Sequence, residues 1–229
     1  MKVGRNGLSF THLFFADDSL LFFKKDNKTI RNLQLILDWY CSISGQKINL
    51  AKLDLYCSPN MPIEDQESLT QTLQVNLVQN PTKYLGMHFN LKGNRCIDFQ
   101  FLVDKLQAKL QSWKARLLSQ AGRTTLITSV LQSLPLYTFA WFQVPDTICN
   151  KMDSVIRSLW WGHEQAERKL HLLNWDQICK PKKLGGLGLK KFKSMNQAML
   201  AKQFWKLNHQ PQSLFARTFK AKYYPNCSI

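Results

Sequence analysis

Residues 99–160 place apolar side chains at every third or fourth position, which is the spacing of amphipathic helices. The first stripe predicts a helix over 99–119 that ends at Gly122. The stripe consists of Phe99, Leu102, Val103, Leu106, Leu110, Trp113 and Leu117. Such a helix has one apolar face, and it needs other helices to cover that face.

Two more helices are expected directly after it. One is predicted over 123–142 with a kink at Pro135, and the other over 145–160 with Pro145 in its first turn. Three helices joined by short connections imply a bundle. Further along the chain, the pattern favours two additional helices near 194–208 and 212–223.

The N-terminal part has a different pattern. Two short, aromatic-rich apolar runs, 8–15 and 19–23, flank Ala16, Asp17 and Asp18, which predicts a β-hairpin. A helix is expected next, over 28–43, started by Asn27 or Thr29 and stopped by Gly45. Shorter elements should follow: strands at 53–57 and 83–89, and a helix at 64–74.

These patterns predict an α+β chain in three parts. Residues 1–96 form a small unit with a hairpin, a helix and short strands, and residues 97–162 form the helical bundle. Residues 163–229 form a basic, glycine-containing loop followed by helices. With 45% hydrophobic residues among 229, the chain is long enough to bury a real core.

The charge is unevenly distributed. The net charge is +16, and residues 97–229 hold 20 Lys and Arg against 7 Asp and Glu, whereas residues 1–96 hold 11 against 8. A cationic surface of this size suits a polyanion, with nucleic acid favoured over an acidic membrane surface. The alternative is that these charges only solvate helix faces.

Cysteine usage and the absence of a long apolar run favour an intracellular protein. The six cysteines form no CxxC pair, and no secretory signal opens the chain. No apolar run approaches the roughly 18 residues of a membrane span. We therefore expect free thiols, no zinc site and no membrane partner, while the oligomeric state stays open.

Asp17 and Asp18 are the sharpest candidates for chemistry. Two adjacent carboxylates at the tip of a hairpin repel each other unless a cation lies between them, and hard oxygen ligands favour Mg²⁺ or Mn²⁺. Such ions assist phosphoryl transfer by activating the nucleophile and steadying the leaving group. The competing interpretation is a solvated turn, because Asp is a common turn residue.

Several blocks of this sequence, in the same order, resemble the reverse transcriptase of plant-type non-LTR (LINE) retrotransposons. Phe15-Ala16-Asp17-Asp18 is similar to the family's catalytic "FADD" box, and Lys83-Tyr84-Leu85-Gly86 to its "KYLG" segment. The other similar blocks are Ser44 to Asn49 with Lys52, Trp113 to Arg123, Phe142 to Pro145, Trp160 to Gly162, Gly185 to Gly188, and Asn196 to Gln203. The match runs from about residue 8 to 226.

The resemblance implies roles for particular residues. Asp17 and Asp18 would be the palm carboxylates that hold the catalytic Mg²⁺, and Lys52 would protonate the leaving pyrophosphate or act on it as a point charge. The alternative is that Lys52 and the nearby Lys47 are solvated surface lysines. The family's active site also needs a third palm carboxylate and nucleotide-binding fingers, which these residues do not include. We therefore expect no DNA synthesis by this chain alone.

The basic half would be the thumb and the region after it. The residues expected to contact the backbone of an RNA template, an RNA–DNA hybrid or a DNA duplex are Lys105, Lys109, Lys114, Arg116, Arg123, Lys182 and Lys183. Backbone amides of the loop at 184–189 are a further candidate phosphate contact, and Lys180 to Lys183 a candidate nuclear-import signal. The tryptophans are expected mostly in the core, with base stacking as the alternative.

Three functions stay open at this point. The chain is a truncated RNA-directed DNA polymerase, a non-catalytic nucleic-acid-binding helical module, or a decayed relic without a partner. Residues 1–90 are expected to fold only marginally, because the hairpin lacks neighbouring strands to cover its apolar side chains. The bundle after residue 97 should fold by itself.

Overall fold

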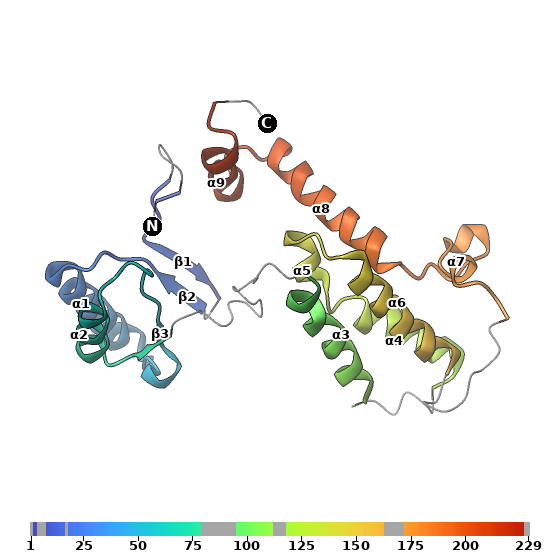
Figure 1. The fold of residues 1–229 in the computed structure, drawn as a ribbon, viewed down its shortest axis with the longest axis horizontal. Helices are drawn as coiled ribbons and strands as arrows, with labels where there is room; N and C mark the ends of the chain where they lie inside the picture. The colour runs from blue at the N-terminus through green and yellow to red at the C-terminus, as the bar shows by residue number, and fades with distance from the viewer. Residues whose placement is uncertain are drawn as a thin grey trace. The chain divides into compact units, whose positions relative to one another are not determined.

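The computed structural model describes residues 2–3, 8–16, 18–78, 95–111, 118–162 and 172–226. It divides into two units: unit 1 contains residues 1–90 and 213–229, and unit 2 contains residues 91–212. Both units are drawn in Figure 1. The fold class is α+β, as predicted, because helices dominate and two small two-stranded sheets accompany them.

Unit 1 begins with the predicted hairpin. Strands β1 (His12–Phe15) and β2 (Asp18–Leu21) are antiparallel, and their register pairs Phe15 with Asp18 across the turn. Ala16 in this turn has a φ of 50°. Strand β3 (Asp54–Leu55) pairs in parallel with β4 (Asn76–Leu77) as a second, separate sheet. The strand expected at 83–89 lies outside the described residues.

Helix α1 (Asn27–Ser44) fits the expected span, but its cap differs from both candidates. Asp26 is the N-cap, and its carboxylate accepts hydrogen bonds from the amide and the hydroxyl of Thr29, at 2.7 and 2.6 Å. These bonds lower the pKa of Asp26. Gly45 ends the helix, as predicted, in the left-handed conformation with a φ of 68°.

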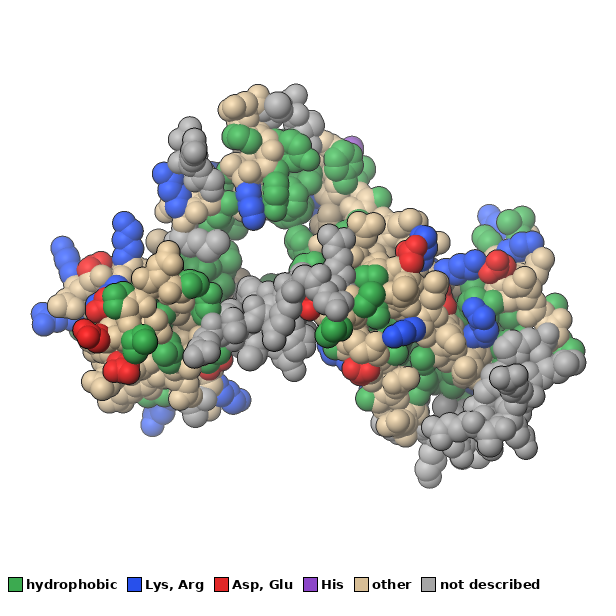
Figure 2. Space-filling view, in the orientation of Figure 1, with side chains coloured by type: hydrophobic (Ala, Val, Ile, Leu, Met, Phe, Trp, Pro, Cys, Tyr) green, Lys and Arg blue, Asp and Glu red, His purple; other side chains and the backbone are tan. Residues whose placement is uncertain are grey.

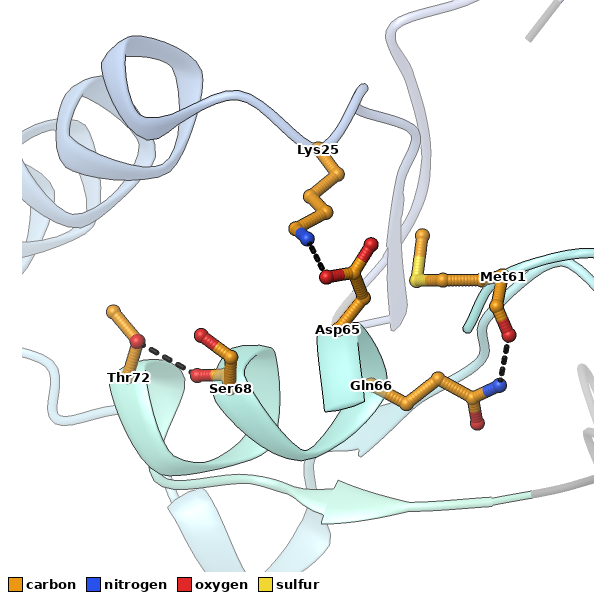
Figure 3. A network of polar contacts seen from close by, with 6 residues as sticks. All are labelled: Lys25, Met61, Asp65, Gln66, Ser68 and Thr72. Atoms are coloured by element: carbon orange, nitrogen blue, oxygen red, sulfur yellow. Dashed lines mark hydrogen bonds and ion pairs between the residues drawn. The ribbon is translucent and has the colours of Figure 1, made fainter. Parts of the chain in front are cut away.

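The remaining helical elements of unit 1 are η1 (Leu50–Lys52), α2 (Ile63–Leu73) and α9 (Leu214–Tyr223). Figure 3 shows polar contacts that position α2: Lys25 pairs with Asp65 in its first turn, and Gln66 donates to the Met61 carbonyl at 2.8 Å. The unit has a small core in which Ile30, Leu55 and Leu69 are buried.

Unit 2 is built from helices. They are α3 (Arg95–Gln111), α4 (Gln120–Leu126), α5 (Leu136–Trp141), α6 (Asp146–Trp161), α7 (Trp175–Ile178) and α8 (Phe192–His209), with η3 (Ile127–Leu131) and η4 (Lys182–Leu184) between them. Helix α3 packs along α6, and α8 packs along α5 and α6 (Figure 1). No helix within the described ranges is both long and apolar enough to cross a bilayer.

Two helix boundaries in unit 2 were predicted wrongly. Gly122 does not end a helix but lies in the first turn of α4, where its amide donates to the hydroxyl of the N-cap Ser119 at 3.2 Å. The helix expected over 123–142 is interrupted by the π-helical turn η3 and by turns before Pro135. Hydroxyls compete for carbonyls here: Ser129 donates to the Thr125 carbonyl at 2.6 Å, which loosens the helix.

A single core unites unit 2. The buried apolar residues of α3, α4, α5 and α6 pack in one cluster with Trp175, Ile178, Leu189, Phe192 and Met195. The residues from α7 to α8 therefore share the core of the bundle. The division of the chain into domains 1–96, 97–162 and 163–229 stays a prediction.

Candidate nucleic-acid interface

The hairpin that carries the candidate carboxylates leaves Asp18 accessible. Asp18 is the first residue of β2, and its side chain is exposed. Asp17 lies outside the described residues, so the geometry of the pair as a metal site stays a prediction. Among the residues described, no group of three or more His, Cys, Asp or Glu side chains is close enough to hold a metal ion.

Lys52 ends the short helix η1, and its side chain is exposed. Its backbone amide donates to the Asn49 carbonyl at 3.0 Å, which fixes the turn. Neither a hydrogen bond nor an ion pair joins Lys52 to Asp18, although both are described. The role of Lys52 beside the carboxylates therefore stays a prediction, and so does the alternative that Lys52 and Lys47, which is exposed as well, are solvated surface lysines.

Helix α3 presents its predicted basic residues on the surface. Lys105 and Lys109 are exposed, while Leu102 and Leu106 of the same helix are buried in the core. The Lys105 ammonium lies 5.1 Å from the centre of the Phe101 ring, close enough for a cation–π contact. Lys114 and Arg116 lie outside the described residues.

Arg123 has a different environment from the lysines. Its guanidinium donates to the Trp160 carbonyl, with Nη1 and the oxygen 3.5 Å apart, and a Cβ at Gly162 would collide with it. A cation at this place is favourable, because the carbonyls at the C-terminus of α6 carry partial negative charge. Arg123 therefore braces the end of α6, and its contact with a phosphate stays a prediction.

The loop after α7 exposes its lysines but not its amides. Lys182 and Lys183 lie in η4 with exposed side chains. The amides from Gly185 to Gly188 donate to carbonyls of the same region, for example Leu187 to Ile178 and Gly188 to Lys180, both at 2.9 Å. The expectation that these amides contact phosphates is therefore wrong for this conformation.

Glycine is required at position 186, because a Cβ there would collide with the carbonyl of Lys180. This close approach holds the loop against the segment after α7. The loop thus serves as a rigid support for the lysines, whose ammonium groups are the remaining candidates for phosphate contacts.

Buried polar residues that the sequence analysis missed position this basic region. Asn196 of α8 accepts from the Val144 amide at 3.0 Å and donates to the carbonyls of Phe139 and Phe142 at 3.0 and 2.8 Å. Gln132 donates to the Lys190 carbonyl at 2.8 Å. The sequence signal that could have identified Asn196 and Gln132 was a polar residue at a core position of an apolar stripe. The hydrogen-bond partners of these residues could not be read from the sequence.

Asp153 of α6 is the buried carboxylate of this network. Its Oδ1 accepts from the Phe192 amide at 3.2 Å, at the N-terminus of α8, where negative charge is favoured. Burial raises the pKa of Asp153 to about 6, although the Phe192 bond and the positive charges of Arg157 and Lys191 lower it. The first turn of α8 is thus tied to α6.

The tryptophans divide between core and surface. Trp160 and Trp175 are buried, as predicted, and the Trp160 indole donates to the Thr124 hydroxyl at 3.0 Å. The core prediction is wrong for Trp141 and Trp205, which are 45% and 55% exposed. Trp113 lies outside the described residues.

Positive charge dominates the end of the chain. Residues 177–229 hold eleven Lys and Arg and no Asp or Glu. Two of these lysines pair with earlier acids: Lys191 with Asp176 at 2.6 Å, and Lys193 with Asp146 at 2.5 Å. Figure 2 shows basic side chains projecting from the surface around α7. Within unit 2, the loop after α7 and helix α8 therefore carry an excess of positive charge, which suits a polyanion.

Comparison with known proteins shows plant relatives. No family model matches the chain. A stretch of 126 residues, 55% of the chain, is 35% identical to a protein of Arabidopsis thaliana named "Putative ribonuclease H protein", and covers 20% of that protein. A stretch of 98 residues, 42% of the chain, is 35% identical to an "Uncharacterized mitochondrial protein" of the same plant, and covers 64% of it.

The chain thus spans a fifth of the first relative and under two thirds of the second. It is homologous to these plant proteins over about half its own length. The more specific relationship to a reverse transcriptase remains a proposal, and so does every activity of the whole relatives.

Proposed function

We propose that these 229 residues correspond to the end of the palm, the thumb and the following region of a LINE-type reverse transcriptase. We further propose that they bind the backbone of an RNA–DNA or DNA duplex without synthesising DNA by themselves. The observation that carries the binding proposal is the excess of positive charge on unit 2, whose residues after Asp176 include no acid. The name of one relative, "Putative ribonuclease H protein", fits a nucleic-acid partner.

The arrangement of unit 2 favours contacts that do not depend on base sequence. The exposed Lys105 stands on α3, whose other face is fixed in the core, and the exposed Lys183 lies in η4, which precedes a loop held by backbone hydrogen bonds. Ammonium groups on long side chains act as point charges toward phosphates, which position a duplex and carry no base specificity. Part of the binding free energy would come from release of counterions, so affinity should fall as salt rises.

The hairpin residues fit a divalent metal only in part. Two carboxylates, Asp17 and Asp18, are suitable hard ligands for Mg²⁺ or Mn²⁺, which would activate a nucleophile and stabilise a leaving group. Polymerase chemistry needs a third carboxylate and a bound nucleotide as well. Among the described residues, Asp18 belongs to no group of three or more His, Cys, Asp or Glu side chains that could hold a metal ion, and we expect the chain alone to be inactive.

The proposal is tested by measuring binding of the purified chain to an RNA–DNA duplex across a salt series, with primer extension in Mg²⁺ and nucleotides in parallel. We expect affinity to fall steeply with salt and no extension. An Asp17→Asn, Asp18→Asn double variant should bind the duplex like the wild type. Templated extension that depends on Asp17 would overturn the inactive assignment, and no binding at low salt would leave a decayed relic as the better account.

A further inference from the structure

The C-terminal half of helix α8 carries an unusual exposed stripe. Lys202, Trp205, Lys206 and His209 follow one another at spacings of three, one and three residues, which places them within an arc of about 100° around the helix. Lys202, Trp205 and His209 are exposed and Lys206 is half-buried. The core contacts of α8 come from other positions, including Phe192 and Asn196.

Trp205 and His209 form a stacked pair on this stripe. Their ring centres are 4.2 Å apart and their planes differ by 21°. The His209 Nδ1 lies 3.0 Å from the Trp205 carbonyl oxygen, and since a carbonyl only accepts, Nδ1 carries the proton of this bond. The bond and the stack together hold both rings in one orientation. A large aromatic surface is thus ordered before any ligand binds, which lowers the entropy cost of binding.

The surroundings of the pair are cationic. Lys202 and Lys206 flank Trp205, and no acid occurs anywhere in residues 177–229. Figure 2 shows hydrophobic side chains at the surface over this part of α8. An apolar protein partner would have to desolvate both lysines, which is costly without acids to pair with them. A polyanion with flat, apolar groups matches the stripe better.

We propose that the Trp205–His209 pair is a stacking platform for the bases of a single-stranded polynucleotide, with Lys202 and Lys206 contacting its phosphates. Bases of a single strand are free to stack on aromatic side chains, whereas those of a duplex are already covered by their neighbours. This site deepens the proposed nucleic-acid binding and is separate from the carboxylates Asp17 and Asp18. Single-stranded nucleic acid would therefore bind at α8, and a duplex would bind at the lysines elsewhere in unit 2.

The test uses the full chain and three labelled strands: oligo-dT, oligo-U and an abasic strand with the same phosphates. Trp205→Ala should weaken binding of the strands with bases by roughly tenfold, the typical effect of losing one stacked base. Trp205→Phe should keep most of the affinity, and Trp205→Ala should change nothing on the abasic strand. The dT and U arms show whether the sugar matters.

Trp39→Ala is the matched control. Trp39 is 68% exposed on α1, but its helical neighbours Leu35, Ile36 and Ile43 are apolar, so its loss should leave single-strand binding unchanged. Thermal unfolding of each variant verifies that the fold is intact. Equal binding by Trp205→Ala and the wild type, or an equal loss on the abasic strand, would overturn the proposal.

Two further readouts separate this site from the rest. Duplex binding should be insensitive to Trp205→Ala. If the wild type binds no duplex, the proposal of backbone contacts is refuted, whereas the single-strand site can still be tested. Self-association that depends on Trp205, measured by sedimentation velocity, would assign the stripe to a second copy of the chain and overturn the proposal.

Discussion

The two units differ in how completely their apolar residues are buried. In unit 1 the buried cluster is small, made of Ile30, Leu55 and Leu69. In unit 2 nineteen buried apolar residues of the described chain form one cluster. Large apolar side chains of unit 1 stay on the surface: Phe14, Phe15, Leu35, Ile36, Trp39, Tyr40 and Ile43 are all more than half exposed.

This difference predicts that unit 2 folds independently and that unit 1 does so less readily. A helix such as α1, with apolar residues on the side away from its own core, is stable in water only when something covers that side. Unit 2 has no such requirement along α3 or α6, whose apolar stripes face the shared core. The comparison predicts that unit 2 sets the measurable stability of the chain and that substitutions in its core have the largest effects.

The largest expected effect is at Phe139 of α5. Its ring is fully buried and contacts Phe192 edge-on, with ring centres 6.0 Å apart. Phe139→Ala should lower the free energy of unfolding of unit 2 by about 4 kcal/mol, because it removes buried area and leaves a cavity. Urea unfolding followed by circular dichroism measures it. Phe14→Ala on β1, 66% exposed, is the control and should cost under about 0.5 kcal/mol.

Asn196→Ala should have the second largest effect on the free energy of unfolding. It leaves the Val144 amide and two carbonyls without their partner in a buried place, at a cost of about 3 kcal/mol. Asn208→Ala, an exposed position on the same helix, should be nearly neutral. Equal effects of the two substitutions in urea unfolding would show that the Asn196 network does not hold α8 on the bundle.

The buried carboxyl group of Asp153 should make the stability of unit 2 depend on pH. Its pKa is raised from 3.8 to about 6 by burial, so the folded chain binds a proton that the unfolded chain lacks between these pH values. Acidification from about pH 6 to 4 should therefore stabilise unit 2 through this group, and the full cost of the buried charge should be present above pH 6.

Asp153→Asn keeps the acceptor for the Phe192 amide and removes the charge. We expect it to stabilise unit 2 at pH 7 by on the order of 2 kcal/mol, with the gain shrinking toward pH 4. The difference between the two unfolding curves at each pH cancels the other carboxylates. A variant less stable than the wild type at pH 7 would show that the charge is held favourably by Arg157 and Lys191.

The smallest expected effect comes from substituting two glycines that both have the left-handed backbone conformation. Gly162 ends α6 with a φ of 67° and lies against Arg123, whereas Gly45 ends α1 with a φ of 68° and has open space around it. Gly45→Ala should cost about 1 kcal/mol for the left-handed conformation alone. Gly162→Ala should cost about 1 kcal/mol more, because the guanidinium must move. Arg123→Ala should remove that extra cost, as thermal unfolding of the double variant would show.

Local signals predicted the elements that depend on nearby residues. The spans of α1 and α6, the stop at Gly45 and the hairpin followed from periodicity, turn residues and caps. The cap at Asp26 was missed because several polar residues there compete for the role. The break inside 123–142 was missed because hydroxyls such as Ser129 bond back to the helix only in the folded geometry.

Contacts between distant segments were beyond the reach of the sequence. Arg123 was expected to contact a nucleic-acid backbone, and its hydrogen bond to the Trp160 carbonyl, far along the chain, could not be read from the sequence. Asn196 joins α8 to the loop between α5 and α6, and no spacing rule indicates such a pair. Trp205 was expected in the core because it lies on an apolar stripe. This prediction failed because such a stripe does not reveal how far along a helix the covering residues extend.

If nucleic-acid binding resides in unit 2, removing paired charges from each unit should have different effects. Two double variants of the full chain are compared for binding to an RNA–DNA duplex across a salt series. One is Lys182→Gln, Lys183→Gln in unit 2, and the other is Lys24→Gln, Lys28→Gln, which changes two exposed lysines of unit 1. We predict that the first pair lowers affinity and reduces the slope of log affinity against log salt by about 1 to 2, roughly 0.9 per lost phosphate contact. The second pair should change neither. Equal losses in both pairs, or no binding by the wild type at low salt, would contradict the claim.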